Sequence, residues 1–301
     1  MLKRTAVINM AHRAALAGTE YAIANSFGLA KDIKYHDHLI YAAMIQGGVS
    51  QIRCCEGSLP ADVARSEFLK SRVILDKDHV CYKTYREIND ILQSHLIVNK
   101  NDENKQSLTI LSFFLADLLY SLDTQSAFVA TLPLPDIRDY QGILSPNILS
   151  VVGCLLSEIK SVNLHLPLPQ FEIESSRVEV FQELLLSDIF ALYSESHVAL
   201  ESSEVDEVAA QKNILAKAIE VRKRFVNTID LKAATLSLIP VTTKLIDTFF
   251  GGWPASLANI FGDRLTSLLK KDKKIVIYDY GKSHYDMLMQ HYSAIKRTEK
   301  I

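Results

Sequence analysis

Hydrophobic residues recur three or four positions apart along most of the chain, which is the spacing of an amphipathic or buried helix. This spacing predicts helices over residues 5–27, 32–46, 58–75, 85–98, 108–122, 173–195 and 283–297, and a further long helix after the acidic segment 201–207. The pattern therefore predicts a mainly α fold, a multi-helix globular assembly with minor extended or β segments.

Only a few segments depart from helical spacing. The stretch KKIVIYDYG, residues 273–281, combines β-branched and aromatic residues and is the best strand candidate. Two copies of Leu-Pro-Leu-Pro, at 132–135 and 166–169, are expected to be extended or turning, because proline lacks a backbone donor and disfavours helix in the residue before it. The polar run NKNDENKQS, residues 99–107, predicts a surface loop.

The acidic segment also marks a candidate domain boundary. The 301 residues suffice for one large domain or two ordinary ones. We predict two subdomains, an N-terminal helical domain of residues 1–198 and a C-terminal helical region of residues 199–301. The most apolar segment, 233–262, contains Lys244 and Asp247, whose charges are costly inside a bilayer, so we expect a buried helix there rather than a membrane span.

The charge balance and the cysteine positions argue against several classes of function. The 33 basic and 35 acidic residues give a net charge of -2, so the protein has no general attraction to nucleic acid or to anionic membranes. A phosphate-binding loop, a Rossmann glycine fingerprint and a G-x-S-x-G nucleophile elbow are all absent from the sequence. No secretory signal is recognised, so we expect a cytoplasmic protein with reduced thiols. The four cysteines have no zinc-ligand spacing: Cys54, Cys55, Cys81 and Cys154.

The triplet His36-Asp37-His38 is the motif that most resembles chemistry. On a helix with about 3.6 residues per turn, His36 and His38 point about 200° apart and cannot bind the same metal ion. His36 instead lies three residues after Ile33, on the same apolar face. This placement favours a histidine that packs in the core.

The doublet His36-Asp37 alone resembles the metal-binding signature of HD-domain phosphohydrolases. The resemblance implies a divalent metal, held by imidazole and carboxylate, that activates water for attack on a phosphoester. Lys34 places a positive charge near such an ion, which opposes this alternative. The residues that would complete the ligand set are His12, His79 or His95, and Asp117.

Two C-terminal segments are candidate contact surfaces. A basic turn with tyrosines nearby can bind a nucleic-acid backbone or another anionic surface, although such charge runs are usually solvated. This turn contains Lys270, Lys271, Lys273 and Lys274. An aromatic group just upstream predicts either a protein interface or a helix corner in the core. Its members are Phe249, Phe250, Trp253 and Phe261.

The lack of a convincing catalytic constellation favours a non-enzymatic function. We expect a helical protein–protein interaction subunit of a larger cytosolic assembly, such as a bacterial defence or toxin system, without a cofactor and with a protein partner or self-association. One alternative is a metal-dependent phosphohydrolase or nuclease centred on His36 and Asp37. The other is an effector that acts on membranes through residues 233–262.

Overall fold

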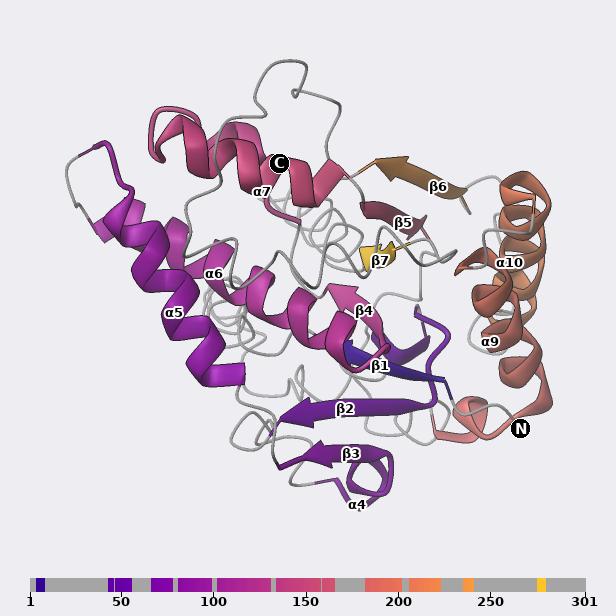
Figure 1. Cartoon of the computed structure of the whole chain (residues 1–301). Helices are drawn as coiled ribbons and strands as arrows, with labels where there is room; N and C mark the ends of the chain where they lie inside the picture. The colour runs from indigo at the N-terminus through magenta and orange to yellow at the C-terminus, as the bar shows by residue number, and fades with distance from the viewer. Residues whose placement is uncertain are drawn as a thin grey trace, which may run out of the picture.

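The computed structural model describes residues 4–8, 43–45, 47–55, 66–77, 81–98, 102–130, 134–157, 159–165, 182–201, 206–222, 235–240 and 275–279. Within these residues, seven short strands form one sheet in the order β3-β2-β1-β4-β7-β5-β6, which runs from the bottom to the top of Figure 1. The strands are β1 (Thr5–Ile8), β2 (Gln51–Cys55), β3 (Val73–Asp76), β4 (Ala127–Ala130), β5 (Ile159–His165), β6 (Thr235–Pro240) and β7 (Ile275–Asp279).

Neighbouring strands are parallel except for β5 and β6, which pair antiparallel at one edge. The mainly α prediction is therefore wrong, and the described part of the chain is an α/β structure. The physical reason is that a parallel strand covered on both faces reads as an uninterrupted apolar run, which spacing alone does not distinguish from a buried helix. β1 lies inside the predicted helix 5–27, and β6 lies inside the segment 233–262 that was expected to be helical.

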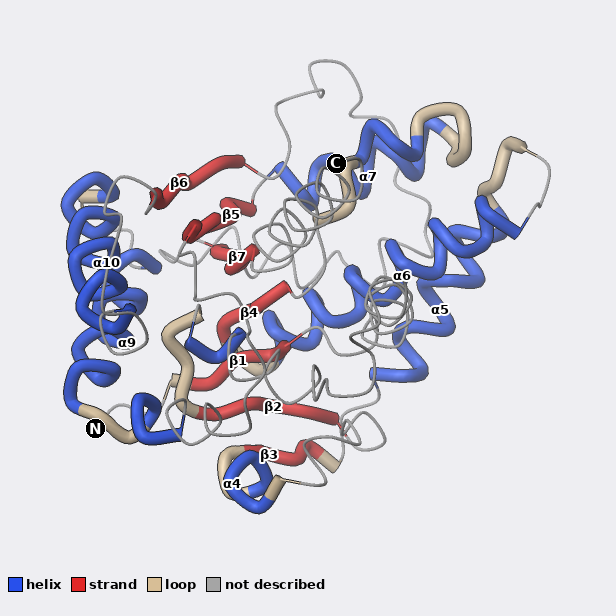
Figure 2. Tube along the Cα trace, turned by 180° about the vertical axis from the view of Figure 1, so that it is seen from behind, coloured by secondary structure: helices blue, strands red, loops and turns tan. Residues whose placement is uncertain are grey.

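Helices cover both faces of the sheet, as Figures 1 and 2 show from opposite sides. Along β1, Ala6 and Ile8 pack on one face, together with Phe190 and Ile214 of the helical pair α9 and α10. Val7 packs on the other face against α5, α6 and α7. We call these the α9 face and the α6 face. The helices are α4 (Glu67–Lys70), α5 (Cys81–Ser94), α6 (Asp102–Asp123), the 3-10 helix η1 (Ile137–Tyr140), α7 (Pro146–Ser157), α9 (Asp188–Glu201) and α10 (Glu207–Arg222).

Several sequence-based elements are confirmed. Helix α5 overlaps the predicted helix 85–98, α6 contains the predicted helix 108–122, α10 is the long helix expected after the acidic segment, and β7 lies within the predicted strand 273–281. The loop predicted at 99–107 is wrong from Asp102 onward, because the polar residues there form the first turns of α6. An acidic first turn is favourable at a helix N-terminus, so polarity alone does not indicate a loop.

The predicted boundary between residues 198 and 199 falls inside α9. Strands from both sides of it pair in one sheet, since β7 lies between β4 and β5. The division into two subdomains stays a prediction, because residues 223–234 and 241–274 are outside the described ranges. Across the part of the chain that the structure describes, no helix has the length and apolarity needed to cross a bilayer.

Candidate functional site

The order of the strands identifies one edge of the sheet as the candidate site. β1, β2 and β3 extend the sheet in one direction, and the chain then crosses to place β4 on the other side of β1. In open parallel α/β sheets, ligands bind outside the carboxyl ends of the strands at such a reversal. We call this edge the switch edge; it is formed by the last residues of five of the six parallel strands, Ile8, Cys55, Asp76, Ala130 and Asp279.

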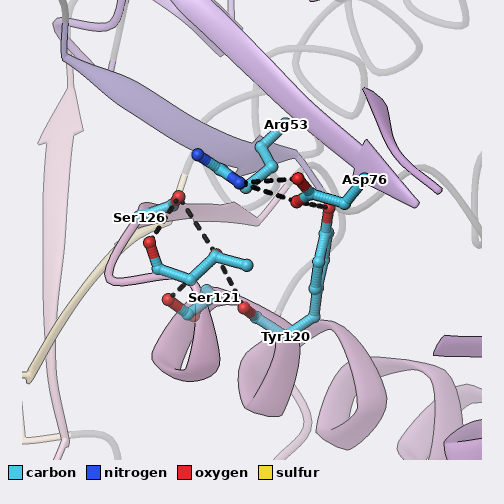
Figure 3. A network of polar contacts seen from close by, with 6 residues as sticks. Arg53, Asp76, Tyr120, Ser121 and Ser126 are labelled. Carbon is cyan, nitrogen blue, oxygen red and sulfur yellow. Dashed lines mark hydrogen bonds and ion pairs between the residues drawn. The ribbon is translucent and has the colours of Figure 1, made fainter. Parts of the chain in front are cut away.

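Figure 3 shows a polar network on the α6 face, where β3 ends at the switch edge. The Nη1 atom of Arg53 donates to both carboxylate oxygens of Asp76, at 2.8 Å each. The hydroxyl of Tyr120 donates to Asp76 Oδ2 at 2.7 Å. Because these side chains come from β2, β3 and α6, the network ties an outer strand to the helix that covers the sheet.

Strand alternation explains why Arg53 and Asp76 meet. Ile52 and Cys54 of β2 lie in the core of the α9 face, so Arg53 between them points to the α6 face. Arg53 pairs in register with Ile74 on β3, and Asp76 follows Ile74 two residues later on the same face. A guanidinium side chain is long enough to reach a carboxylate one step further along the neighbouring strand.

The end of α6 holds Tyr120 in place. Ser126 N–H donates to the carbonyl of Ser121 at 2.9 Å, and Gln125 N–H donates to that of Leu122 at 3.2 Å. Gln125 has a φ of 52°, so these bonds form the helix-ending arrangement in which a left-handed residue satisfies the last carbonyls. The turn ends α6 three residues before β4 begins, and leaves Tyr120 aimed at Asp76 (Figure 3).

The Arg53–Asp76 pair is partly accessible to solvent. Its side chains are 24% and 23% exposed, so a small molecule can reach them. The Nε atom of Arg53 is buried and has no hydrogen-bond partner among the residues that the structure describes. A guanidinium fixed in this way can donate to a phosphate, carboxylate or hydroxyl oxygen with defined geometry.

A second polar cluster lies on the α9 face. Arg4, which is 7% exposed, donates from Nη1 to the carbonyl of Gly47 and from Nη2 to Glu201 Oε1 at the end of α9. Tyr278 of β7 donates its hydroxyl to the same Glu201 oxygen at 2.8 Å. The Arg4 guanidinium carbon lies 4.8 Å from the centroid of the Tyr278 ring, within the range of a cation–π contact.

His197 completes this cluster one helical turn before Glu201. Its ring is fully buried and stands edge-on to Tyr193 and Tyr278, with centroids 4.5 and 4.9 Å away. Within the described part of the chain, neither Nδ1 nor Nε2 has a hydrogen-bond partner. The ring also presses against Gly48, whose φ is +60° and whose position has no room for a Cβ atom beside the imidazole. We call Arg4, Tyr193, His197, Glu201 and Tyr278 the Arg4 cluster.

Electrostatics fix the protonation states in the Arg4 cluster. Burial lowers the pKa of His197 well below its ordinary value, and the charge of Arg4 lowers it further, so the imidazole is neutral. Burial raises the pKa of Tyr278 well above that of a free phenol, so its hydroxyl keeps the proton that it donates to Glu201. The cluster therefore joins one cation, one carboxylate and neutral rings.

The site residues predicted from the sequence mostly lie outside the described ranges. His36 and Asp37 do so, as do the candidate ligands His12 and His79, and the metal site stays a prediction. The other two candidates are placed on or beside helices, with His95 Nδ1 3.4 Å from Ser145 Oγ and Asp117 within α6. No group of three His, Cys, Asp or Glu side chains suited to a metal ion occurs within the described residues.

The two predicted C-terminal surfaces also lie outside the described ranges. They comprise the aromatic group Phe249, Phe250, Trp253 and Phe261 and the basic turn Lys270, Lys271, Lys273 and Lys274. Both stay predictions. Cys54, one of the four cysteines, is 4% exposed in the core of the α9 face, a position typical of a packing residue rather than a nucleophile.

Sequence reasoning missed both polar groups. Arg4 is separated from Glu201 by 197 positions, and Tyr120 from Asp76 by 44, so no local spacing connects them. A weak signal was present in the charged Arg53 within the short run QIRCC and in Asp76 at the end of VILD. A polar residue at the carboxyl end of an apolar run is informative once that run is known to be a strand.

Comparison with protein-family models, with curated protein sequences and with solved structures finds no match to this chain.

Proposed function

We propose that this protein binds a polar small molecule, of about the size of a nucleoside or nucleotide, at the switch edge of its sheet. The observation that carries the proposal is the reversal of strand order between β1 and β4 in a parallel sheet with helices on both faces. In other open α/β sheets the ligand crevice lies outside the carboxyl ends of the strands at such a reversal, and fold-level analogy associates it with nucleotide ligands.

The Asp76 network supports the same position. It provides an oriented, partly exposed carboxylate and guanidinium at the β3 end of the edge. Strands lie about 4.8 Å apart, so a ligand that begins at β1 reaches β3 after about 10 Å. The Rossmann glycine fingerprint is absent after β1, which argues against a dinucleotide whose pyrophosphate rests on a glycine turn. A mononucleotide, nucleoside or phosphorylated metabolite fits the residues better.

The proposal is tested by titration calorimetry with matched ligands, such as adenosine, adenosine monophosphate and their uridine counterparts. For a ligand that binds, Arg53→Gln is expected to weaken binding about tenfold to a hundredfold, the usual effect of losing a hydrogen bond from a charged group. The control is Asp90→Asn, a charge change at an exposed position of α5, which should leave affinity unchanged.

Hydrogen exchange with bound ligand then locates the site. Protection is expected in peptides that cover residues 51–55 and 73–76, which end at the switch edge. Protection confined to residues 47–50 and 124–126, at the opposite edge of the sheet, would contradict the proposal. Failure of every tested ligand class to bind the folded protein would also count against it.

A second proposal keeps the interaction function expected from the sequence. The segment around α9 and α10 carries several exposed large apolar side chains, with Leu186 at 59%, Leu192 at 48% and Val208 at 56%. We propose that this side contacts a second copy of the chain. Sedimentation velocity should then show concentration-dependent dimers that Leu192→Lys and Val208→Lys abolish. Wild-type protein that stays monomeric at high concentration would refute it.

A further inference from the structure

The Arg4 cluster, together with Gly48 against which it packs, connects four parts of the chain that are distant in the sequence. Arg4 lies immediately before β1, Gly48 before β2, Tyr278 on β7, and His197 and Glu201 on the last turns of α9. Arg4 and Tyr278 both bind Glu201, and the His197 ring fills the space between Tyr278 and Gly48. The cluster is therefore the polar attachment of α9 to the sheet.

None of the described residues offers His197 an acceptor for a second proton. Both ring nitrogens are buried and lack a hydrogen-bond partner in the described ranges, so an imidazolium would hold two unsatisfied donors there. Glu201 does not accept from the ring in the described structure; its Oε1 accepts from Arg4 and Tyr278 instead. The described titratable and charged groups around the ring are Arg4 from the start of β1, Tyr278 from β7, and Tyr193 and Glu201 from α9; the segment at Gly48 contributes backbone only.

We propose that the Arg4 cluster is an acid-sensitive latch: protonation of His197 releases α9 from the α9 face of the sheet while the α6 face stays packed. A proton on the buried ring would add a second cation beside Arg4 and can be accommodated only when α9 moves away and water reaches the imidazole. The device is local because α6, α5 and α7 pack in a separate core on the other face. It does not depend on ligand binding at the switch edge.

The direction of the pH effect follows from the two states of His197. When α9 is released, the imidazole of His197 has an ordinary pKa near 6.5. When α9 is attached to the sheet, the pKa of His197 is well below that value. Attachment is therefore fully stable above pH 6.5 and weakens as the pH falls below it, because only the released state takes up the proton. The open fraction should approach a tenfold rise per pH unit as the pH falls below 6.5, and should be about sixteenfold higher at pH 5.0 than at pH 6.5.

Hydrogen exchange of the full chain at a series of pH values between 7.5 and 5.0, corrected for the intrinsic pH dependence of exchange, tests the latch. Peptides from α9 (Asp188–Glu201) should lose protection below pH 6.5, while those from α6 (Asp102–Asp123) should not. His197→Phe, which keeps a ring against Tyr193 and Tyr278, should remove the pH dependence of α9. The matched control His95→Phe, at a partly exposed histidine, should leave it intact.

A direct titration of His197 in the wild-type protein tests the latch even if the His197→Phe variant fails to fold. The imidazole carbon resonance of His197 in the wild-type protein should titrate well below pH 6.5, whereas that of a released α9 would titrate at the ordinary value. Three results would overturn the proposal: an ordinary pKa for His197 in the attached state, unchanged acid sensitivity of α9 in a folded His197→Phe variant, or equal loss of protection in α9 and α6, which would mark global unfolding.

Discussion

Replacing Gly48 with alanine tests the packing of the Arg4 cluster most sharply. The position has a φ of +60°, and a Cβ atom there would lie 2.9 Å from His197 Nε2 and closer still to Cδ2. The left-handed conformation costs an alanine about 1–2 kcal/mol. Overpacking against a buried ring adds about 1–3 kcal/mol. Gly48→Ala should therefore reduce the free energy of unfolding by about 2–5 kcal/mol.

A double-mutant cycle separates these two contributions. In a His197→Ala background the imidazole is gone, and only the backbone cost of the alanine at position 48 remains. The two substitutions should thus couple by about 1–3 kcal/mol, and the cost of the cavity left by His197→Ala cancels from the cycle. Urea unfolding followed by circular dichroism gives the four free energies, provided the denaturant slopes of the variants agree.

Gly142 supplies a matched control. Its φ is +80°, yet nothing lies within 4 Å of the position where a Cβ atom would stand. Gly142→Ala should cost only the backbone contribution of about 1–2 kcal/mol, and should add to His197→Ala within about 0.5 kcal/mol. Additive behaviour of Gly48→Ala with His197→Ala would refute the contact between glycine and imidazole, and with it the described position of α9.

Three further substitutions test other parts of the structure by the same unfolding assay. Gln125→Gly should raise stability by about 1 kcal/mol, because glycine adopts the left-handed conformation at the end of α6 without strain; a loss of stability would contradict the assigned turn. Tyr120→Phe should cost about 1–2 kcal/mol by removing the hydroxyl that donates to Asp76, and an unchanged midpoint would show that the bond is absent in solution. Arg4→Met should cost about 2–4 kcal/mol of unfolding free energy, since it leaves Tyr278 and the partly buried Glu201 without their cation. The control Lys217→Met, which removes the more exposed ion pair with Glu220, should cost less than about 0.5 kcal/mol. Equal costs of the two substitutions would refute the role of Arg4.

The elements that the sequence could predict are those whose pattern is long or distinctive. The apolar run 108–122 is too long for a strand and correctly indicated α6, and IVIYD has the β-branched and aromatic composition of a strand. β1 and β4 have four residues each, TAVI and AFVA, which is too short for a period of two to be recognised. With those strands missed, the parallel sheet and its switch edge could not be inferred.

The polar clusters were hidden for a different reason. Their bonds depend on which strands become neighbours, and that order follows from crossovers of tens of residues rather than from local spacing. His197 lies in a helix whose sequence carries polar residues on its buried side, including Ser194 and Ser196, so no clean apolar stripe marked the face that packs on the sheet. In the sequence, the buried His197 therefore resembled an ordinary surface histidine.

The position of β7 has a consequence for how the protein is made. Residues 275–279 insert between β4 and β5, although those two strands are about 115 to 150 residues earlier in the chain. During synthesis, β4 and β5 leave the ribosome long before the strand that joins them, and each then has an unpaired edge open to other chains. Translation that stops before residue 275 should thus yield an aggregation-prone fragment, and slow, chaperone-assisted maturation is the behaviour that this topology favours.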